Sequence, residues 1–168
     1  IELIIFDLDD TLFQTKAKVL VLKDNKVVKR LANQEYNTYS LSANERFDFT
    51  EFSNAKLFNE SSKPISKTIK ILKTVLKERK NSEVIIVTAR PNFDNKKLFL
   101  ETFRNFEINI DQLYVERAGN LKMKNAAESK LVIFEKYLIS KKYKMVTIFD
   151  DDLSNIKALF SLEDKYPD

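Results

Sequence analysis

Two side chains on which many enzymes depend are missing from this chain of 168 residues, which contains no cysteine and no histidine. Without cysteine there can be no disulfides, thiolate nucleophiles or zinc–thiolate sites. Without histidine there can be no Ser-His triad, phosphohistidine chemistry or imidazole ligand for a metal. Any chemistry must therefore use carboxylates, lysine, arginine and hydroxyl groups.

Glycine is almost absent as well, since Gly119 is the only one in the chain. A single glycine excludes the G-x-G-x-x-G fingerprint and glycine-rich phosphate loops, so nucleotide-dependent kinases and Rossmann dehydrogenases are not expected. No apolar run approaches the roughly 20 residues that a transmembrane helix needs. The first residues resemble a strand rather than a charged leader with a cleavage site, which favours a cytoplasmic location.

The composition is that of a globular protein, with 43% hydrophobic and 32% charged residues. A chain of this length is expected to form one domain around one core. Lysine and arginine outnumber aspartate and glutamate by 29 to 25. If the acidic residues gather in one site, the remaining surface is more basic than this difference indicates and favours phosphorylated partners, although charge for solubility explains the excess equally well.

Apolar runs and helical periods alternate along most of the chain. Four short, nearly continuous apolar runs have the character of strands covered on both faces; they span residues 1–8, 82–88, 108–115 and 144–149. Apolar residues at helical spacing predict four helices between and after these runs. The first begins after Pro64, the second and third span 92–106 and 127–138, and the last begins near 156. This order predicts an α/β fold with a parallel sheet and helices on both faces.

The segment 14–62 interrupts this alternation. Two β-rich runs surround the turn Asp24-Asn25 and predict a hairpin. A short helix at NQEYNTY and an aromatic patch at FDFTEF follow. We therefore expect one domain, 1–168, with 14–62 as a flap or small cap after the first strand. Its aromatic residues fit a small accessory core better than a surface for stacking on bases.

Polar residues that could bind a ligand or take part in catalysis follow three of the predicted strands. In an open parallel sheet, ligands bind outside the carboxyl ends of the strands. The first strand ends in DLDDT (7–11), the second in TAR (88–90) and the last in DDD (150–152). Clustered carboxylates in a low-dielectric site repel one another unless a cation is present. Oxygen ligands without histidine or cysteine favour Mg²⁺.

The D-x-D spacing allows a division of roles. Once the strand breaks into a loop, Asp7 and Asp9 need not point the same way, so one can face the metal while the other reaches the substrate. That arrangement suits a nucleophile and a proton donor. Thr88 offers a hydroxyl to a transferring phosphoryl group, and a lysine is expected to neutralise the nucleophile and the phosphate.

These stretches resemble the motifs of the haloacid dehalogenase superfamily of phosphohydrolases. FDLDDTL is similar to the first motif, VIIVTAR to the second and TIFDDD to the fourth, in the same order and with similar separation. Together they frame nearly the whole chain outside 14–62. The resemblance implies a Rossmann-like sheet, a Mg²⁺ cofactor and an aspartyl-phosphate intermediate.

The resemblance also implies a role for each residue. Asp7 would be the nucleophile and a ligand of Mg²⁺. Asp9 would be the general acid and base, with its backbone carbonyl on the metal. Asp150 would be the further metal ligand, supported by Asp151 directly or through water. Thr88 would hold the phosphoryl oxygens.

The lysine of the third motif has three candidates. Lys130 lies twenty residues before Asp150, a spacing usual in the family. The helix SKLVIFEKYL around it also resembles the corresponding helix in the phosphatase domain of phage polynucleotide kinase. Lys122 and Lys124 are the alternatives.

Other polar residues near the strand ends have structural explanations. Asp152 suits the N-terminus of the following helix as a cap. Arg90 and Arg117 follow predicted strands and could contact a substrate phosphate, although surface ion pairs explain them equally well.

Within the family, the presence of both Asp7 and Asp9 favours hydrolysis of phosphate monoesters. The short insertion predicts an open site that suits a bulky substrate. The likeness to polynucleotide kinase favours nucleotides or nucleic-acid 3′-phosphate ends. A phosphatase of a small metabolite or phosphoprotein is the alternative enzyme, and a binding module that retains the site without turnover is the third hypothesis.

Overall fold

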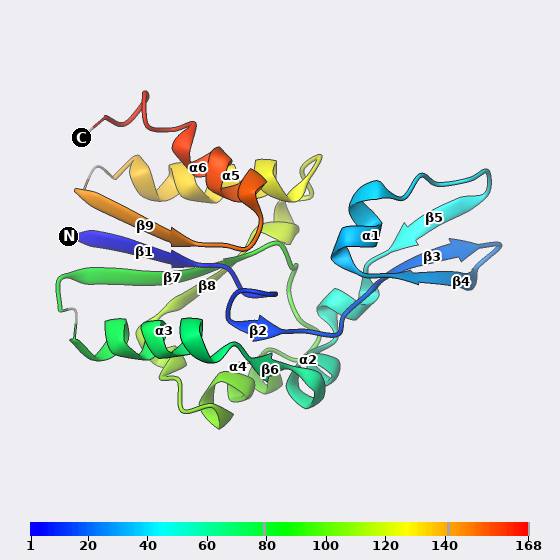
Figure 1. Ribbon diagram of the computed structural model, residues 1–168, viewed down its shortest axis with the longest axis horizontal. Coiled ribbons are helices and arrows are strands. Elements are labelled where there is room, and N and C mark those ends of the chain that lie inside the picture. Colours follow the sequence, from blue (N-terminus) through cyan, green and yellow to red (C-terminus); the bar gives the residue numbers. More distant parts are fainter. Residues whose placement is uncertain (79, 141, 168) are drawn as a thin grey trace.

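A four-stranded parallel sheet forms the centre of the molecule in the computed structural model, which describes residues 1–78, 80–140 and 142–167 (Figure 1). The strand order is β8-β7-β1-β9, and the register places Ile4 opposite Val84 on one side and Thr147 on the other. All four strands therefore end at the same edge of the sheet. The strands are β1 (Glu2–Phe6), β7 (Ser82–Thr88), β8 (Tyr114–Arg117) and β9 (Met145–Phe149).

Helices cover both faces of this sheet, so the predicted α/β fold is confirmed (Figure 1). Alternate residues of β1 point to opposite faces: Ile4 and Phe6 belong to one hydrophobic core, and Leu3 and Ile5 belong to the other. Because both faces are buried, the strand is apolar at nearly every position. The first core contains residues of α2 (Ala55–Ser61), α3 (Ser66–Glu78) and α4 (Lys96–Asn105), and the second contains residues of α5 (Ala126–Leu138) and α6 (Leu153–Phe160). No helix in the described ranges is both long and apolar enough to cross a membrane.

Two predicted elements are shorter than expected. The strand expected within 108–115 begins only at Tyr114, because a 3₁₀ turn, η2 (Ile110–Gln112), precedes β8, and the buried Ile108 and Ile110 lie before the strand. The helix predicted over 92–106 begins at Lys96, because the Asn95 side chain accepts a hydrogen bond from the Leu98 N–H and caps it. In both places apolar residues of a turn or loop pack into the core. The sequence pattern cannot distinguish such residues from the buried residues of a helix or strand.

A small antiparallel sheet follows the first strand, and we call residues 15–54 the flap. Its strands have the order β4-β3-β5, and Asp24 and Asn25 have φ angles of 52° and 62° in the turn of the predicted hairpin. The flap projects beyond the carboxyl edge of the central sheet (Figure 1). Its elements are β3 (Val19–Lys23), β4 (Lys26–Leu31), α1 (Asn33–Thr38), β5 (Glu45–Asp48) and the 3₁₀ turn η1 (Thr50–Ser53).

The flap has its own core and a defined base. Val19, Val21 and Leu31 pack with aromatic rings of the flap, as expected of a small accessory core; these rings belong to Tyr36, Tyr39, Phe47 and Phe52. At the base, β2 (Phe13–Gln14) pairs antiparallel with β6 (Lys63–Pro64). The predicted insertion 14–62 also includes α2, which packs on α4 in the main core.

The single glycine holds two loops of the carboxyl edge together. Gly119 lies in the 3₁₀ turn η3 (Ala118–Leu121) after β8, and its N–H donates to the Arg90 carbonyl at 3.2 Å. A Cβ atom at Gly119 would lie 2.5 Å from the Ala89 carbonyl oxygen and 2.6 Å from the Pro91 nitrogen. Backbone atoms cannot rotate away, so only glycine allows this approach.

We therefore expect Gly119→Ala to lower the free energy of unfolding by about 1–3 kcal/mol, because the loop after β7 must shift. Urea denaturation measures this change. Lys122→Gly is the matched control in the same loop: Lys122 has a φ of 51°, so its replacement should change stability by less than about 1 kcal/mol. An unchanged midpoint for Gly119→Ala would contradict the close approach of the two loops.

Candidate functional site

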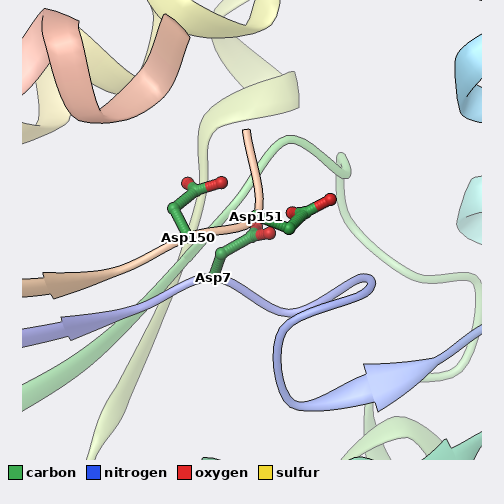
Figure 2. Close-up of side chains that lie close together, drawn as sticks. All are labelled: Asp7, Asp150 and Asp151. Atoms are coloured by element: carbon green, nitrogen blue, oxygen red, sulfur yellow. The ribbon is translucent and has the colours of Figure 1, made fainter. Parts of the chain in front are cut away.

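Three carboxylates converge where the strand order reverses, between β1 and β9. Asp7 follows β1, Asp150 and Asp151 follow β9, and the Asp7 N–H still donates to the Phe149 carbonyl at 2.8 Å. One carboxylate oxygen of each aspartate lies within 4.8 Å of the others (Figure 2). The predicted meeting of the acids of the first and last strands is therefore confirmed, at the position where open α/β sheets bind ligands.

A buried lysine lies between two of these acids. Lys130 is only 1% exposed, and its Nζ lies 2.9 Å from Asp7 Oδ1 and 2.8 Å from Asp150 Oδ2. Its place in α5 gives it this reach, since the helix packs over the second face of the sheet. Lys122 and Lys124, the alternatives considered from the sequence, are exposed in the loop before α5.

Burial and charge pairing compete at these two residues, and the outcome differs between them. It raises the pKa of Asp7 well above the usual value, and Asp150 adds to the rise although Lys130 opposes it. For Lys130, burial alone would lower the pKa, but the charges of Asp7 and Asp150 outweigh it and raise the pKa. Three carboxylates and one ammonium leave an excess of two negative charges when all are ionised. That excess matches one divalent cation, whose charge would favour the ionised form of Asp7.

Thr11 connects the loops that follow β1 and β9. Its hydroxyl donates to Asp7 Oδ2 at 3.1 Å and accepts from the Asp151 N–H at 3.2 Å. With Lys130 on Oδ1, both oxygens of Asp7 have a partner. The orientation of the Asp7 carboxylate is therefore defined before any ligand binds.

Asn155 holds Asp150 in place, and the sequence analysis missed it. Its Nδ2 lies 3.2 and 3.1 Å from the two oxygens of Asp150, and the residue is 4% exposed. Within the described part of the chain, its buried Oδ1 has no hydrogen-bond partner. The available signal was its position in α6, directly after the acidic run. Asp152 caps this helix as predicted, accepting from the Ser154 N–H.

Asp9 faces a different partner from Asp7. The guanidinium of Arg90 binds both its oxygens, with Nε 2.9 Å from Oδ2 and Nη2 2.5 Å from Oδ1. Burial alone would raise the pKa of Asp9, but the charge and hydrogen bonds of Arg90 outweigh it and lower the pKa. Asp9 is therefore an ionised carboxylate whose side chain lies outside the cluster of three acids.

Arg90 forms an ion pair, which was one of its two explanations from the sequence, but the pair is buried and not at the surface. The residue is 2% exposed, and its guanidinium donates to the Phe52 carbonyl at 3.2 Å. It also lies over three aromatic rings, one in the flap and two in the first core. Those rings are Phe52, Phe58 and Phe93, with centroids 5.1 to 5.3 Å from the guanidinium carbon. The charged partner Asp9 and the rings of Phe52 and Phe58 come from residues distant in the sequence, whereas Phe93 lies three residues from Arg90.

The remaining predicted residues lie at the same edge of the sheet with other contacts. Thr88 is fully buried at the end of β7, and its hydroxyl oxygen accepts from the Arg90 N–H at 3.1 Å. Arg117 is half-buried and hydrogen-bonds the Tyr114 hydroxyl at 3.5 Å. Thr88 therefore shapes the loop that carries Arg90, and its contact with a phosphoryl group stays a prediction.

The chain matches no model of a known protein family, no curated protein and no solved structure. The chemistry of the site must therefore be argued from its own geometry. That geometry combines three carboxylates that could hold a cation, a lysine bound to two of them, and a separate carboxylate paired with arginine.

Lys130→Met should lower the free energy of unfolding by about 3–5 kcal/mol without divalent cations, because it leaves two buried carboxylates without their counter-charge. Urea denaturation in the presence of a chelator measures the loss. Lys122→Met and Lys124→Met are matched controls at exposed positions and should change stability by less than about 0.5 kcal/mol. Equal effects of all three substitutions would contradict the special position of Lys130.

Asn155→Leu should weaken the binding of a divalent cation by the cluster about tenfold or more, because Asp150 loses the amide donor that contacts both its oxygens and keeps only Lys130 and the Asp152 N–H. Calorimetric titration with Mg²⁺ gives the affinity directly. Ser154→Ala, one residue earlier in α6, removes a hydroxyl that contacts Asp152 and should leave the affinity unchanged. An unchanged affinity for Asn155→Leu would show that Asp150 needs no such support.

Proposed function

We propose that this protein is a Mg²⁺-dependent phosphohydrolase of the haloacid dehalogenase superfamily, which hydrolyses phosphate monoesters through an aspartyl-phosphate intermediate. The observation that carries the proposal is the position of Asp7. It lies at the carboxyl end of the central strand, in a cluster of three acids, with Lys130 on one oxygen and Thr11 on the other. A carboxylate oriented in this way beside a fixed positive charge is suited to attack phosphorus.

The donor set of the cluster fits Mg²⁺. Asp7, Asp150 and Asp151 would hold the ion through carboxylate oxygens, with the Asp9 carbonyl as a further ligand. Hard oxygen donors and the excess of two negative charges favour a divalent cation over a monovalent one. When bound, Mg²⁺ supplies positive charge to the transferring phosphoryl group.

In the proposed reaction, a carboxylate oxygen of Asp7 forms a bond to phosphorus while the bond from phosphorus to the ester oxygen breaks. The leaving oxygen takes a proton from Asp9, which must first take that proton up from solvent on leaving its ion pair with Arg90, because the pair holds it ionised before substrate binds. Water then attacks phosphorus, the bond to Asp7 breaks, and inorganic phosphate leaves. Asp9 accepts the proton of that water and is ready for the next turnover. Lys130 offsets negative charge throughout, and Thr88 would contact the phosphoryl oxygens.

Arg90 supports the second half of this cycle. By holding Asp9 ionised, it prepares that carboxylate to accept a proton from water. Arg90 also binds both carboxylate oxygens of Asp9, and this contact keeps the Asp9 side chain apart from the cation site. We assign Arg90 a positioning role, because it acts through Asp9 and not on the phosphate.

The proposed substrate is a phosphorylated nucleotide or nucleic-acid end, in keeping with the motif likeness and the excess of basic residues. Phosphatases of small metabolites or phosphoproteins would use the same residues. A binding module without turnover would gain nothing from Asp9 and Arg90, whose pairing serves proton transfer.

Phosphate release from an aryl phosphate and a panel of nucleotides and 3′-phosphorylated oligonucleotides, with and without Mg²⁺, tests the proposal. Release should require Mg²⁺, and Asp7→Asn should reduce it at least about 10³-fold because the nucleophile is lost. Asp152→Asn is the matched control, since asparagine also caps helices and the residue lies outside the cluster. If the wild type is as inactive as Asp7→Asn while folded and loaded with Mg²⁺, the binding module becomes the better explanation.

A further inference from the structure

An aromatic pair on the flap lies beside the acidic loop that follows β1. Asn33, the first residue of α1, donates from Nδ2 to Asp10 Oδ2 at 3.4 Å. Tyr36 follows one turn later on the same side of α1, and its ring meets Phe49 edge to face at 5.7 Å. The hydrogen bond to Asp10 thus places this part of the flap next to the site, and Figure 1 shows α1 on the side of the flap that faces the strand ends.

A second, independent series of contacts leads to the same aromatic pair. Asp9 binds Arg90, and Arg90 binds the Phe52 carbonyl and packs on the Phe52 ring. The Phe52 N–H donates to the Phe49 carbonyl at 3.0 Å, so one tight turn joins the two residues. The flap is therefore anchored to the acidic loop on both sides of the Tyr36–Phe49 contact.

Phe49 is unusual among the aromatic residues of the flap because it is not covered. Its side chain is 46% exposed, whereas Phe47 and Phe52 are half-buried in the flap core. Its ring contacts the rings of Tyr36 and Phe47, with centroid distances of 5.7 and 6.2 Å. The result is an exposed aromatic face held firmly in place by packed rings.

The surface of α1 beside this face is polar and carries one charged residue. The single charged residue of α1 is Glu35, whose Oε1 accepts a hydrogen bond from the Ala32 N–H at 3.1 Å. Asn33 and Asn37 lie on one side of the helix, four residues apart, and both are exposed. Carboxamides carry donors and acceptors together, and can pair with the edge of a heterocycle.

We propose that Phe49, supported by Tyr36, and the carboxamides of α1 form the subsite for the leaving group, and that this leaving group is a nucleoside. The inference rests on the proposed phosphatase function and specifies its substrate class. A base would stack on Phe49 while its polar edge meets the carboxamides. Sugar phosphates and phosphoserine have no planar heterocycle to use this surface, and phosphotyrosine has no polar edge of that kind.

Kinetics on two substrates test this subsite. Adenosine 3′-monophosphate has a base, and glycerol phosphate has none. Phe49→Ala should lower kcat/KM for the nucleotide about tenfold or more, mainly through KM, because one stacking partner is lost. The same variant should hydrolyse glycerol phosphate within about twofold of wild type, since the acids are unchanged. Phe49→Tyr should retain the preference for the nucleotide.

Phe160→Ala is the matched control, because this phenylalanine is 62% exposed on α6, outside the flap. It should leave both substrates unaffected. Equal losses on both substrates with Phe49→Ala, or no loss on either, would overturn the subsite while the phosphatase function stands.

Adenosine binding gives a readout that needs no turnover. Calorimetry should show about tenfold weaker binding of adenosine to Phe49→Ala than to wild type and Phe49→Tyr. If neither phosphate ester is hydrolysed but adenosine binding still depends on Phe49, the phosphatase proposal fails and the subsite stands. Equal adenosine affinity in all variants overturns the subsite.

Discussion

The ion pairs of Lys130 with Asp7 and Asp150 join the ends of the two strands on which the site is built. The ammonium and both carboxylates are almost completely withdrawn from solvent, and the two distances are below 3 Å. Desolvating three charged groups costs free energy that hydrophobic side chains would not require, so stability alone does not explain the arrangement. The proposed function does explain it, because a site that binds a cation and a phosphate needs charges that are already oriented before the ligands arrive.

Two aspartates in one short loop have opposite electrostatic environments. The pKa of Asp7 is raised by burial, with Asp150 nearby, whereas Arg90 overcomes burial and lowers the pKa of Asp9. Pairs of titratable groups whose surroundings move their pKa values apart are characteristic of sites that divide acid, base and nucleophilic roles. The fold produces this separation by breaking β1 at the sheet edge, where Asp10 adopts a φ of 61° and the chain turns away.

In the proposed function, the flap contributes the surface that binds the leaving group of the substrate. It touches the acidic loop through Asn33 and touches Arg90 through Phe52, so its position depends on the same residues that orient Asp9. A rigid small sheet with its own aromatic core can hold a binding surface over an open site without the bulk of a full domain. In the proposed function, recognition of the leaving group and preparation of the proton acceptor would therefore depend on one set of contacts.

Local sequence determined the sheet, the hairpin and the meeting of the acids, because burial on two faces, a two-residue turn and a strand end each leave a pattern within a few residues. Lys130 was indicated by the family resemblance, through a spacing from Asp150 that is usual in that family, and not by a local pattern. The apolar pattern was misleading at Ile108 and Ile110, because these residues are buried in a turn and loop and not in a strand. The tertiary structure alone decided the partner of Arg90, 81 residues from Asp9, and the support of Asp150 by Asn155. Such pairings depend on which side chains the fold brings within hydrogen-bonding distance, and no local period records that distance.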